Sequence, residues 1–465
     1  MLAFRRALAA AALPCALAAA LLAAPRPAAA QTRLLPDSQP ATAPAAPAAA
    51  PDTAAPASAS AAAPLPIVFS GELRTRSERD HPTGAPADAF TYLRARFGVR
   101  VDPAPGARLV LQVQDSRVLG AEGNAAAAVA EQLDLHQGYV ELSAPWRGIR
   151  AAARVGRQEI ALGNERLVGA VGWSNVGRSF DGVRVLLAPD GAAPGAERWT
   201  ATAFAATVEE RGPRFGPSGA GARAADHAVV GAFATRALAA AGAAEVTALY
   251  DAGARYRGYN SANRATLDVR LRAPRVLGLS AELEGALQAG RQRDAADSAS
   301  VRAQDVRAWL VGARVGTATA PARRAAAAVG VDVLSGDATP HDGRYTAFAT
   351  AYATNHPFYG VMDLIGDPAA TTRERGLVDA LATGSAKLTG ALALRGELHH
   401  FTLATGAGRD LGWEADVTLP LSVAPAAGVE LGYSAFRAGR DAASVGFGAA
   451  GSYRDWGYVQ LRVAF

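Results

Sequence analysis

The chain has 465 residues, and its 47 Lys and Arg residues nearly balance 42 Asp and Glu, giving a formal net charge of +5. This balance argues against a polybasic surface that would bind phosphates, so we predict no nucleic-acid partner. The only cysteine, Cys15, excludes an intramolecular disulfide framework.

The first 66 residues are predicted to lie outside the folded domain. Residues 1–30 combine Arg5 and Arg6 with an apolar run and a small-residue cleavage site, which is typical of a secretory signal peptide. A retained membrane anchor is the alternative, and the alanine-rich run and the good cleavage site disfavour it. Residues 31–66 are rich in Ala and Pro and have few large apolar side chains, so we predict a disordered spacer.

From residue 67 onward, apolar and charged residues alternate, which predicts β-strands with one apolar and one charged face. In residues 92–101, for example, Phe97 lies on the face opposite Arg94 and Arg96. Residues 264–272 repeat the pattern. No later run reaches ~18 consecutive apolar residues, so no transmembrane helix is expected.

A soluble β-sandwich would also alternate, but three features favour a membrane barrel. The apolar positions are mostly Ala, Gly, Val and Leu, which suit a smooth lipid-facing surface. The segments are about ten residues long, the length that a tilted strand needs to cross a bilayer. Aromatic residues recur at the segment ends, as in interfacial girdles.

The last ten residues, WGYVQLRVAF, place apolar side chains at alternate positions and end on Phe465. This ending resembles the C-terminal signal of bacterial outer-membrane barrels, which implies the barrel-assembly machinery as a partner. We therefore predict an all-β fold over residues 67–465, a closed transmembrane antiparallel barrel with an arginine-rich polar lumen in the outer membrane. At roughly 22 residues per strand and connection, about 18 strands are expected.

The connections between strands are predicted to differ at the two ends of the barrel. Short connections are expected to be periplasmic turns, and long polar ones extracellular loops. The predicted turns are residues 102–106 and 424–428, and the predicted loops are residues 119–132, 209–226, 290–305 and 337–375.

The sequence offers no convincing catalytic or metal-binding constellation, so we predict no cofactor and no metal. His399 and His400 are adjacent in a strand and point to opposite faces, so they cannot bind one metal ion together. A Ser/His pair of an outer-membrane hydrolase is conceivable, but no sequence neighbourhood singles one out.

The charged strand faces carry the functional prediction. Arg74 shares a face with Glu72, and Arg94 shares one with Arg96, so all four side chains are expected to point into the lumen. They form either ion pairs that stabilise the wall or a path for carboxylates, which guanidinium groups bind through two parallel hydrogen bonds.

Two segments in the first half of the chain and three in the second carry a family resemblance. They are LDLHQGYVEL (133–142), RVGRQEIALGNERLVGAVGWSNVGRSFDGVRV (154–185), VDVLSGD (331–337), NHPFYGVMDLIGD (355–367) and LGWEADVTL (411–419). The second of these is the most specific. Together they resemble the alginate export family of outer-membrane β-barrel porins over essentially the whole barrel.

The resemblance implies an 18-stranded barrel that passes an anionic polyuronate through an arginine-lined, anion-selective constriction. The implied constriction residues are Glu141, Arg154, Arg157, Glu159, Arg166, Arg178, Asp181 and Arg184. The loop 337–375, with His356 and Tyr359, is implied to be a mouth or gating loop.

These observations predict passive passage of an alginate-like polysaccharide or a related carboxylate. The expected partners are outer-membrane lipid and the anionic saccharide, and the spacer could contact a periplasmic protein. The alternative is a general small-solute porin whose arginines are structural. An outer-membrane hydrolase and an adhesin-like structural barrel are less favoured readings. An open pore has no intrinsic direction, so the sequence does not distinguish export from uptake.

Overall fold

The computed structural model describes residues 66–82, 86–119, 131–192, 197–209, 227–238, 242–252, 262–276, 278–293, 303–317 and 325–465. The predicted signal peptide lies outside these residues, as does nearly all of the predicted spacer. Within the described ranges, no helix has the length and apolarity needed to cross a bilayer.

Strands make up most of the described chain. The wall strands are β1 (Ile67–His81), β2 (Asp88–Ala104), β3 (Ala107–Leu119), β4 (Glu131–Trp146), β5 (Ile149–Gln158), β6 (Phe180–Pro189), β7 (Trp199–Glu209), β8 (His227–Ala237), β9 (Ala243–Ala252), β10 (Ala262–Val276), β11 (Leu279–Arg293), β12 (Ala303–Thr317), β13 (Ala325–Leu334), β15 (Leu377–Lys387), β16 (Ala393–Leu403), β17 (Asp410–Ala424), β18 (Ala427–Ala438) and β19 (Tyr453–Ala464). The other elements are the strand β14 (Arg344–Tyr345), the helix α3 (Pro368–Thr371) and the 3-10 helix η2 (Ala442–Val445).

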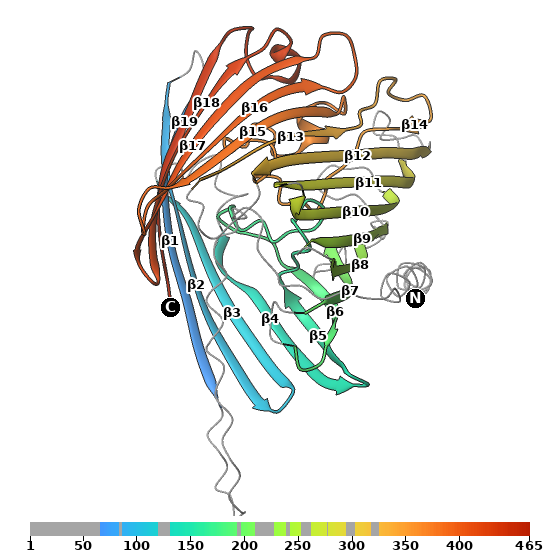
Figure 1. Cartoon of the computed structure of the whole chain (residues 1–465), viewed down its shortest axis with the longest axis vertical. Coiled ribbons are helices and arrows are strands. Elements are labelled where there is room, and N and C mark those ends of the chain that lie inside the picture. Colours follow the sequence, from blue (N-terminus) through green and yellow to red (C-terminus); the bar gives the residue numbers. More distant parts are fainter. Residues whose placement is uncertain are drawn as a thin grey trace, which may run out of the picture.

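The wall is a closed barrel in which each strand pairs antiparallel with the next one along the chain (Figure 1). β19 pairs back with β1 and closes the sheet. Of the 19 strands in the described residues, only the two-residue β14 pairs in parallel, with β12, and it belongs to a loop. The remaining 18 form the wall, which confirms the predicted strand number. Closure leaves no unpaired strand edge in the hydrocarbon, where water cannot satisfy backbone groups.

The barrel buries its polar face and exposes its apolar one. On β10, Leu271 is 45% exposed, whereas its neighbour Arg270 is only 7% exposed. Leu267 and Val269 are exposed like Leu271, and Asp268 is buried like Arg270. This arrangement is the reverse of a soluble protein and is expected where lipid contacts the outer surface. The predicted alternation is therefore confirmed.

The C-terminal residue completes the closure. Phe465 and Gly71 exchange two backbone hydrogen bonds of 3.0 Å, which extend the ladder between β1 and β19. A side chain at position 71 would meet the Phe465 ring, since an added Cβ would lie 2.3 Å from Phe465 Cε1. Glycine at this position therefore lets the terminal ring pack flat across β1.

The connections have the predicted asymmetry where the structure describes them. Residues 102–106 form a tight turn in which Gly106 has a φ of 79°, and residues 424–427 form another. The other end of the barrel carries two long connections, residues 159–179 and 335–376. The central parts of the three other predicted loops lie outside the described residues.

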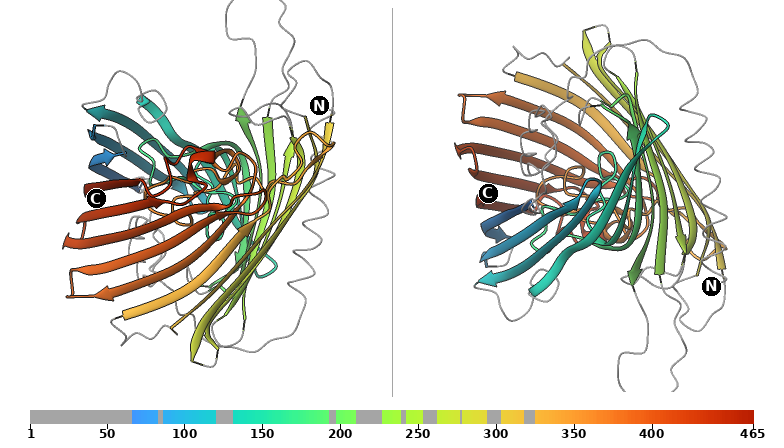
Figure 2. Two further views of the ribbon diagram at one scale, coloured as in Figure 1. Left: turned by 90° about the horizontal axis from the view of Figure 1, so that it is seen from above. Right: turned by 90° about the horizontal axis from the view of Figure 1, so that it is seen from below.

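The two long connections fold into the barrel, and the views from above and below show them between the strands (Figure 2). We call residues 159–179 the short insert and residues 335–376 the long insert. Their apolar side chains form one core with interior residues of strands on several sides of the barrel. The loop predicted over residues 337–375 thus lies inside the barrel.

Candidate functional site

The two inserts bind each other and form one body, which we call the plug. Val168 and Tyr352 form a parallel β-bridge, and Gly169 donates its N–H to the Tyr352 carbonyl over 2.8 Å. Glu165 Oε2 accepts from Thr354 Oγ1 over 2.6 Å. Arg178, predicted as a constriction residue, donates to the carbonyl of Tyr352. Arg178 therefore joins the inserts to each other.

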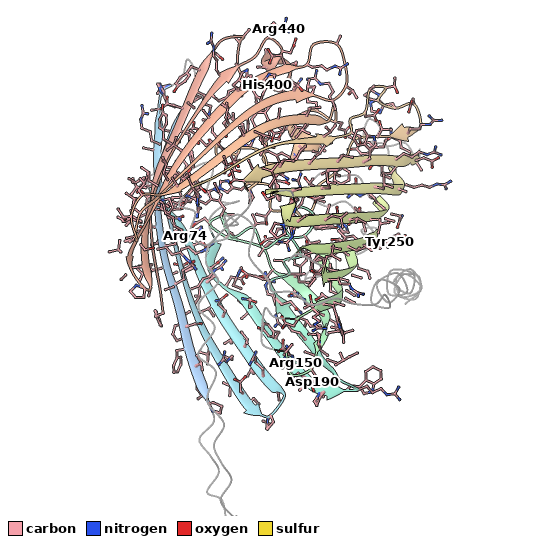
Figure 3. The ribbon with its side chains drawn as sticks, in the orientation of Figure 1. Arg74, Arg150, Asp190, Tyr250, His400 and Arg440 are labelled. Atoms are coloured by element: carbon pink, nitrogen blue, oxygen red, sulfur yellow. The ribbon has the colours of Figure 1, made fainter. Side chains whose placement is uncertain are left out.

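Interior arginines of β1 and β2 hold the short insert by its backbone. Arg74 donates to the carbonyls of Gly172 and Ser174 over 2.8 Å each, and Arg94 donates to the same two oxygens over 3.1 and 2.9 Å. Arg76 donates to the carbonyl of residue 173 over 2.8 Å. All three arginines are buried, and Figure 3 labels Arg74 on β1. A carbonyl oxygen accepts a hydrogen bond from a guanidinium group but, being neutral, does not cancel the positive charge of that group.

Two carboxylates, Glu78 and Glu72, lie against these three arginines, and Arg76 is paired with Glu78 over 2.6 Å. Glu72 binds Arg94 over 2.6 Å and also Arg462 of β19 over 2.7 Å, so one acid serves two cations. Arg96 lies 3.2 Å from Glu159, the first residue of the short insert. We call the interior faces of β1–β6 and β19 the basic wall. Its arginines at and below the plug are Arg74, Arg76, Arg94, Arg96, Arg154, Arg184 and Arg462.

Trp173, at the tip of the short insert, links the basic wall to the long insert. The Arg76 guanidinium lies 3.8 Å from the centroid of the Trp173 ring. His356 stacks on Trp173 with a centroid separation of 4.2 Å and an interplanar angle of 7°. His356 Nδ1 lies 2.9 Å from Asp363 Oδ1 within the same insert. His356, predicted as a gating residue, is thus part of the contact between the inserts.

Arg166 crosses to the opposite wall and is almost completely buried there. Its guanidinium lies 3.1 Å from Glu284 on β11 and 2.9 Å from Asp332 on β13, and it sits 4.1 Å from the Phe358 ring centroid. Tyr359 Oη lies 3.4 Å from Arg166, and burial raises the pKa of its phenol above the usual value. Arg166 and Tyr359 therefore anchor the plug and are shielded from solutes.

The wall that receives Arg166 is rich in carboxylates, and we call the interior faces of β9–β17 the acidic wall. Its buried acids are Glu245, Asp251, Asp268, Glu284, Asp332, Asp379, Glu414 and Asp416. Some are paired with arginines of the same wall, such as Arg270 with Glu245 at 2.6 Å. Others bind the plug, since Glu414 Oε1 accepts the N–H of Met362 over 3.0 Å. None of these acids was among the predicted site residues.

Arg154 and Arg184 lie below the plug, toward the short-turn end. They are direct partners across β5 and β6, so their guanidinium groups occupy the same level of the lumen. Glu141 binds Arg154 over 2.6 Å, and the Arg154 guanidinium lies 4.1 Å from the Tyr139 ring. Within the described residues, Arg184 Nε is buried without a hydrogen-bond partner. Arg154 precedes Gln158, the last residue of β5, by four positions, so it lies about 13 Å along the strand from the start of the short insert.

The structure does not place Arg157 and Asp181 in the predicted constriction. They are direct strand partners, with Arg157 Nη1 3.1 Å from Asp181 Oδ2, and they share the outward positions of β5 and β6 with Val155 and Val183. Arg154 and Arg184 lie on the opposite face, because neighbouring strand residues alternate between the two sides. Arg157 and Asp181 thus form a surface ion pair, and the prediction for them is corrected.

Two basic-wall residues were missed as site residues although the sequence contains a signal for them. Arg76 follows Arg74 by two positions and therefore shares its face. Arg462 alternates with apolar residues in the last strand. The contacts of the inserts have no such signal, since Arg166 and Asp332 are 166 positions apart.

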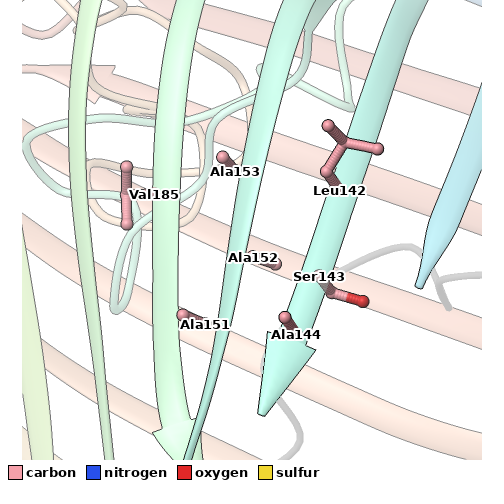
Figure 4. Close-up of a pocket in the computed structure, with 7 residues that line it drawn as sticks. All are labelled: Leu142, Ser143, Ala144, Ala151, Ala152, Ala153 and Val185. Atoms are coloured by element: carbon pink, nitrogen blue, oxygen red, sulfur yellow. The ribbon is translucent and has the colours of Figure 1, made fainter. Parts of the chain in front are cut away.

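A shallow apolar groove lies between β4, β5 and β6 (Figure 4). Ser143 contributes its only polar side chain. The groove offers no charged group to a carboxylate, so the candidate site is the barrel interior around the plug.

Comparisons with known proteins agree with this architecture. The family model for alginate export matches residues 66–454. OpdO of Pseudomonas aeruginosa has the same fold at 15% identity, with a TM-score of 0.55 over 86% of this chain and 97% of that chain. A BenF-like porin from Pseudomonas fluorescens Pf-5 matches at 9% identity, with a TM-score of 0.57 over 86% and 98%.

The structure of OccK2 (OpdF) of Pseudomonas aeruginosa in complex with glucuronate also matches, at 11% identity and a TM-score of 0.55, covering 86% of this chain and 98% of that chain. No curated protein sequence matches the chain. Because the family model spans most of its length, the protein belongs to the alginate export family and forms a porin channel in the bacterial outer membrane.

Proposed function

We propose that this porin prefers anions and passes carboxylate sugars of the uronate class, including alginate-like polyuronates or their shorter fragments. The observation that carries the proposal is the Arg154–Arg184 pair. Two interior arginines are direct partners across neighbouring strands, and Glu141 binds one of them, Arg154. A solute carboxylate that binds there replaces part of its hydration with guanidinium donors and meets a net positive charge.

The chemistry of the basic wall supports a series of weak anion-binding positions and not a single tight binding site. Arg74 keeps its charge because it donates to backbone carbonyls, whereas Arg94 divides its hydrogen bonds between the same carbonyls and Glu72. A series of weak attractive positions raises the local anion concentration and still lets each anion leave. Membership of the alginate export family and the glucuronate held by OccK2 (OpdF) favour uronates among carboxylates.

One observation favours a second candidate, a general small-solute porin with structural arginines. Arg166 is enclosed by Glu284, Asp332 and the Phe358 ring, and Arg74 is bound to the short insert. These arginines position the plug whatever the solute is. The two candidates differ in whether the channel distinguishes anions from neutral sugars.

The test is reversal potential under a KCl gradient in planar bilayers. We expect the native porin to prefer Cl⁻, and we expect Arg154→Gln with Arg184→Gln to lower that preference about two- to fivefold per charge removed. Arg157→Gln is the matched control, because it removes an arginine of the same strand that faces outward. Cation preference in the native porin would contradict the proposal.

The substrate class is tested by current block. Glucuronate and short oligouronates should reduce the Cl⁻ current at concentrations at which glucose does not. The block should weaken in the Arg154/Arg184 double variant and persist in Arg157→Gln. Equal effects of glucose and glucuronate would support the general porin instead.

A further inference from the structure

We propose that the acidic wall contains a divalent transition-metal site formed by His399 and Glu397 of β16 and Asp416 of β17. It is independent of which solute crosses the channel. The sequence analysis rejected a metal at the adjacent histidines His399 and His400, and their opposite orientations still exclude that pair. The site proposed here joins His399 to carboxylates on its own side of the sheet.

Strand pairing brings the three residues together. Glu397 and Asp416 are direct partners across β16 and β17, and His399 lies two positions further along the same face. One ligand atom from each residue lies within 4.8 Å of the others. His399 Nε2 is 3.4 Å from Glu397 Oε2. Two ligands that each bind one tetrahedral zinc ion at about 2.0–2.1 Å are themselves about 3.4 Å apart.

A second carboxylate fixes the histidine for metal binding. His399 Nδ1 lies 3.0 Å from both carboxylate oxygens of Asp379 on β15. A carboxylate only accepts hydrogen bonds, so Nδ1 carries the proton and donates it to Asp379. By the same argument Nε2 carries a proton towards Glu397 Oε2 in the metal-free protein, and a bound metal ion would replace this proton and take the Nε2 lone pair. A carboxylate behind a metal-binding histidine is the usual supporting contact, since it fixes the tautomer and raises the basicity of the ligand.

Asp416 gives an independent indication of a ligand. Its side chain is only 2% exposed, and within the described residues neither carboxylate oxygen has a close, well-aligned hydrogen bond. The neighbouring donors are the hydroxyl of Ser434, its buried direct partner on β18, and the N–H of Val361. A buried carboxylate with such weak partners is costly. A bound cation would remove that cost and would give the Ser434 hydroxyl a role as a further ligand or donor.

The charge of the surrounding groups calls for a divalent ion. Four carboxylates surround the imidazole, those of Asp379, Glu397, Glu414 and Asp416. The nearby bases on β16 are His399 and Arg395, the interior residue that precedes Glu397 on the same face. Even with His399 protonated, the acids exceed the bases by two. Arg314 and Arg166 do not close the gap, because both bind Asp332.

The donor set indicates the class of metal. One imidazole nitrogen with two carboxylate oxygens suits Zn²⁺ and its divalent first-row neighbours, whereas Mg²⁺ and Ca²⁺ prefer oxygen ligands alone. The site lies beside the long insert, because Glu414 also accepts the Met362 N–H. A bound ion would therefore stabilise the part of the wall that holds the plug.

The full-length porin in detergent, stripped with EDTA, tests the site by titration with Zn²⁺ in a calorimeter. We expect one Zn²⁺ per chain. Co²⁺ should give the visible absorption of a coordinated ion, which a merely structural histidine would not produce. His399→Gln should abolish binding, and Asp379→Asn should weaken it about 10- to 100-fold, as loss of a supporting contact does.

His400→Gln is the matched control, since His400 points to the other face of β16 and stacks on Trp413 at 4.3 Å. It should bind Zn²⁺ like the native protein. If His399→Gln does not fold, Asp416→Asn decides the question. This variant removes an uncompensated buried charge, so its unfolding temperature without metal should rise, and Zn²⁺ should no longer shift it.

The proposal is overturned if the native porin binds no Zn²⁺, or if Asp416→Asn keeps the native affinity. It is also overturned if His400→Gln loses binding together with His399→Gln. In the first case, a protonated His399 shared by Asp379 and Glu397 accounts for the cluster without a metal.

Discussion

The basic wall and the acidic wall hold the same plug by opposite chemistry. On the basic wall, Arg74 and Arg94 donate to backbone carbonyls of the short insert, and these contacts leave their charge in place. On the acidic wall, Glu284 and Asp332 receive a side chain of the plug, Arg166, and the charges cancel. Under the proposed function, the difference separates two roles for arginine: the basic-wall arginines attract anions, and Arg166 fixes the plug.

The largest loss of stability is expected at Arg166, the plug residue whose guanidinium binds the carboxylates of the acidic wall. Arg166→Met would leave Glu284 and Asp332 without this partner in a buried setting, and breaking a buried pair in this way costs about 3–5 kcal/mol. Urea unfolding of the porin in lipid vesicles should show this loss. Arg157→Met, which removes an exposed ion pair of the outer face, should cost about 0–1 kcal/mol. Equal losses in the two variants would show that Arg166 does not anchor the plug.

The barrel wall could be predicted from the sequence, but the plug could not. Local alternation identifies which face of a strand meets lipid, as Leu271 and Arg270 show, because the side-chain period of a strand is fixed. The same rule correctly places Arg94, Arg96, Arg154 and Arg184 inside. Alternation does not show whether the inward residues line an open path or are covered by the plug.

Two kinds of residue could not be assigned from the sequence. Arg157 and Asp181 were included because they belong to a family motif, and a motif does not state which face of the strand its residues occupy. Arg166 and Tyr359 depend on a loop that folds back into the barrel and meets partners far away in the chain. Such contacts arise when distant parts of the chain pack together, so they produce no repeating pattern in the local sequence.

Trp173→Ala tests whether the basic wall holds the plug as firmly as the acidic wall does. The variant removes the ring between Arg76 and His356, and a cation–π contact with partial burial is worth about 1–2 kcal/mol. We expect larger and noisier single-channel conductance together with a modest loss of stability. Trp413→Ala, which removes an outward-facing ring, should leave the conductance unchanged. If both variants conduct like the native porin, the stack does not restrain the plug.

Glu72→Gln tests whether the charge of the basic wall sets the anion preference, because it makes this wall more positive. Glu72 is the acid shared by Arg94 and Arg462, so its neutralisation should raise the preference for Cl⁻ about two- to fivefold, the size expected for one charge worth about 1 kcal/mol. Asp455→Asn, on the outward face of β19, is the control and should leave the reversal potential unchanged. A lower anion preference in Glu72→Gln would show that Glu72 mainly holds the arginines in position.

The smallest effect concerns Glu159, an acid of the plug that binds Arg96 of the basic wall. Burial alone would raise its pKa, but the hydrogen bond with His136 and the charge of Arg96 outweigh burial and lower the pKa below the usual 4.5. A lowered pKa means that the ionised form stabilises the folded state above the usual value, and that this contribution disappears as the pH falls through the folded-state pKa. Glu159→Gln should therefore be less stable than the native porin by about 1 kcal/mol at pH 7. The difference should persist down to about pH 4.5 and vanish only below it. If it instead vanished between pH 7 and 5, Glu159 would be protonated in the folded porin, and the basic wall would not extend its field to the base of the plug.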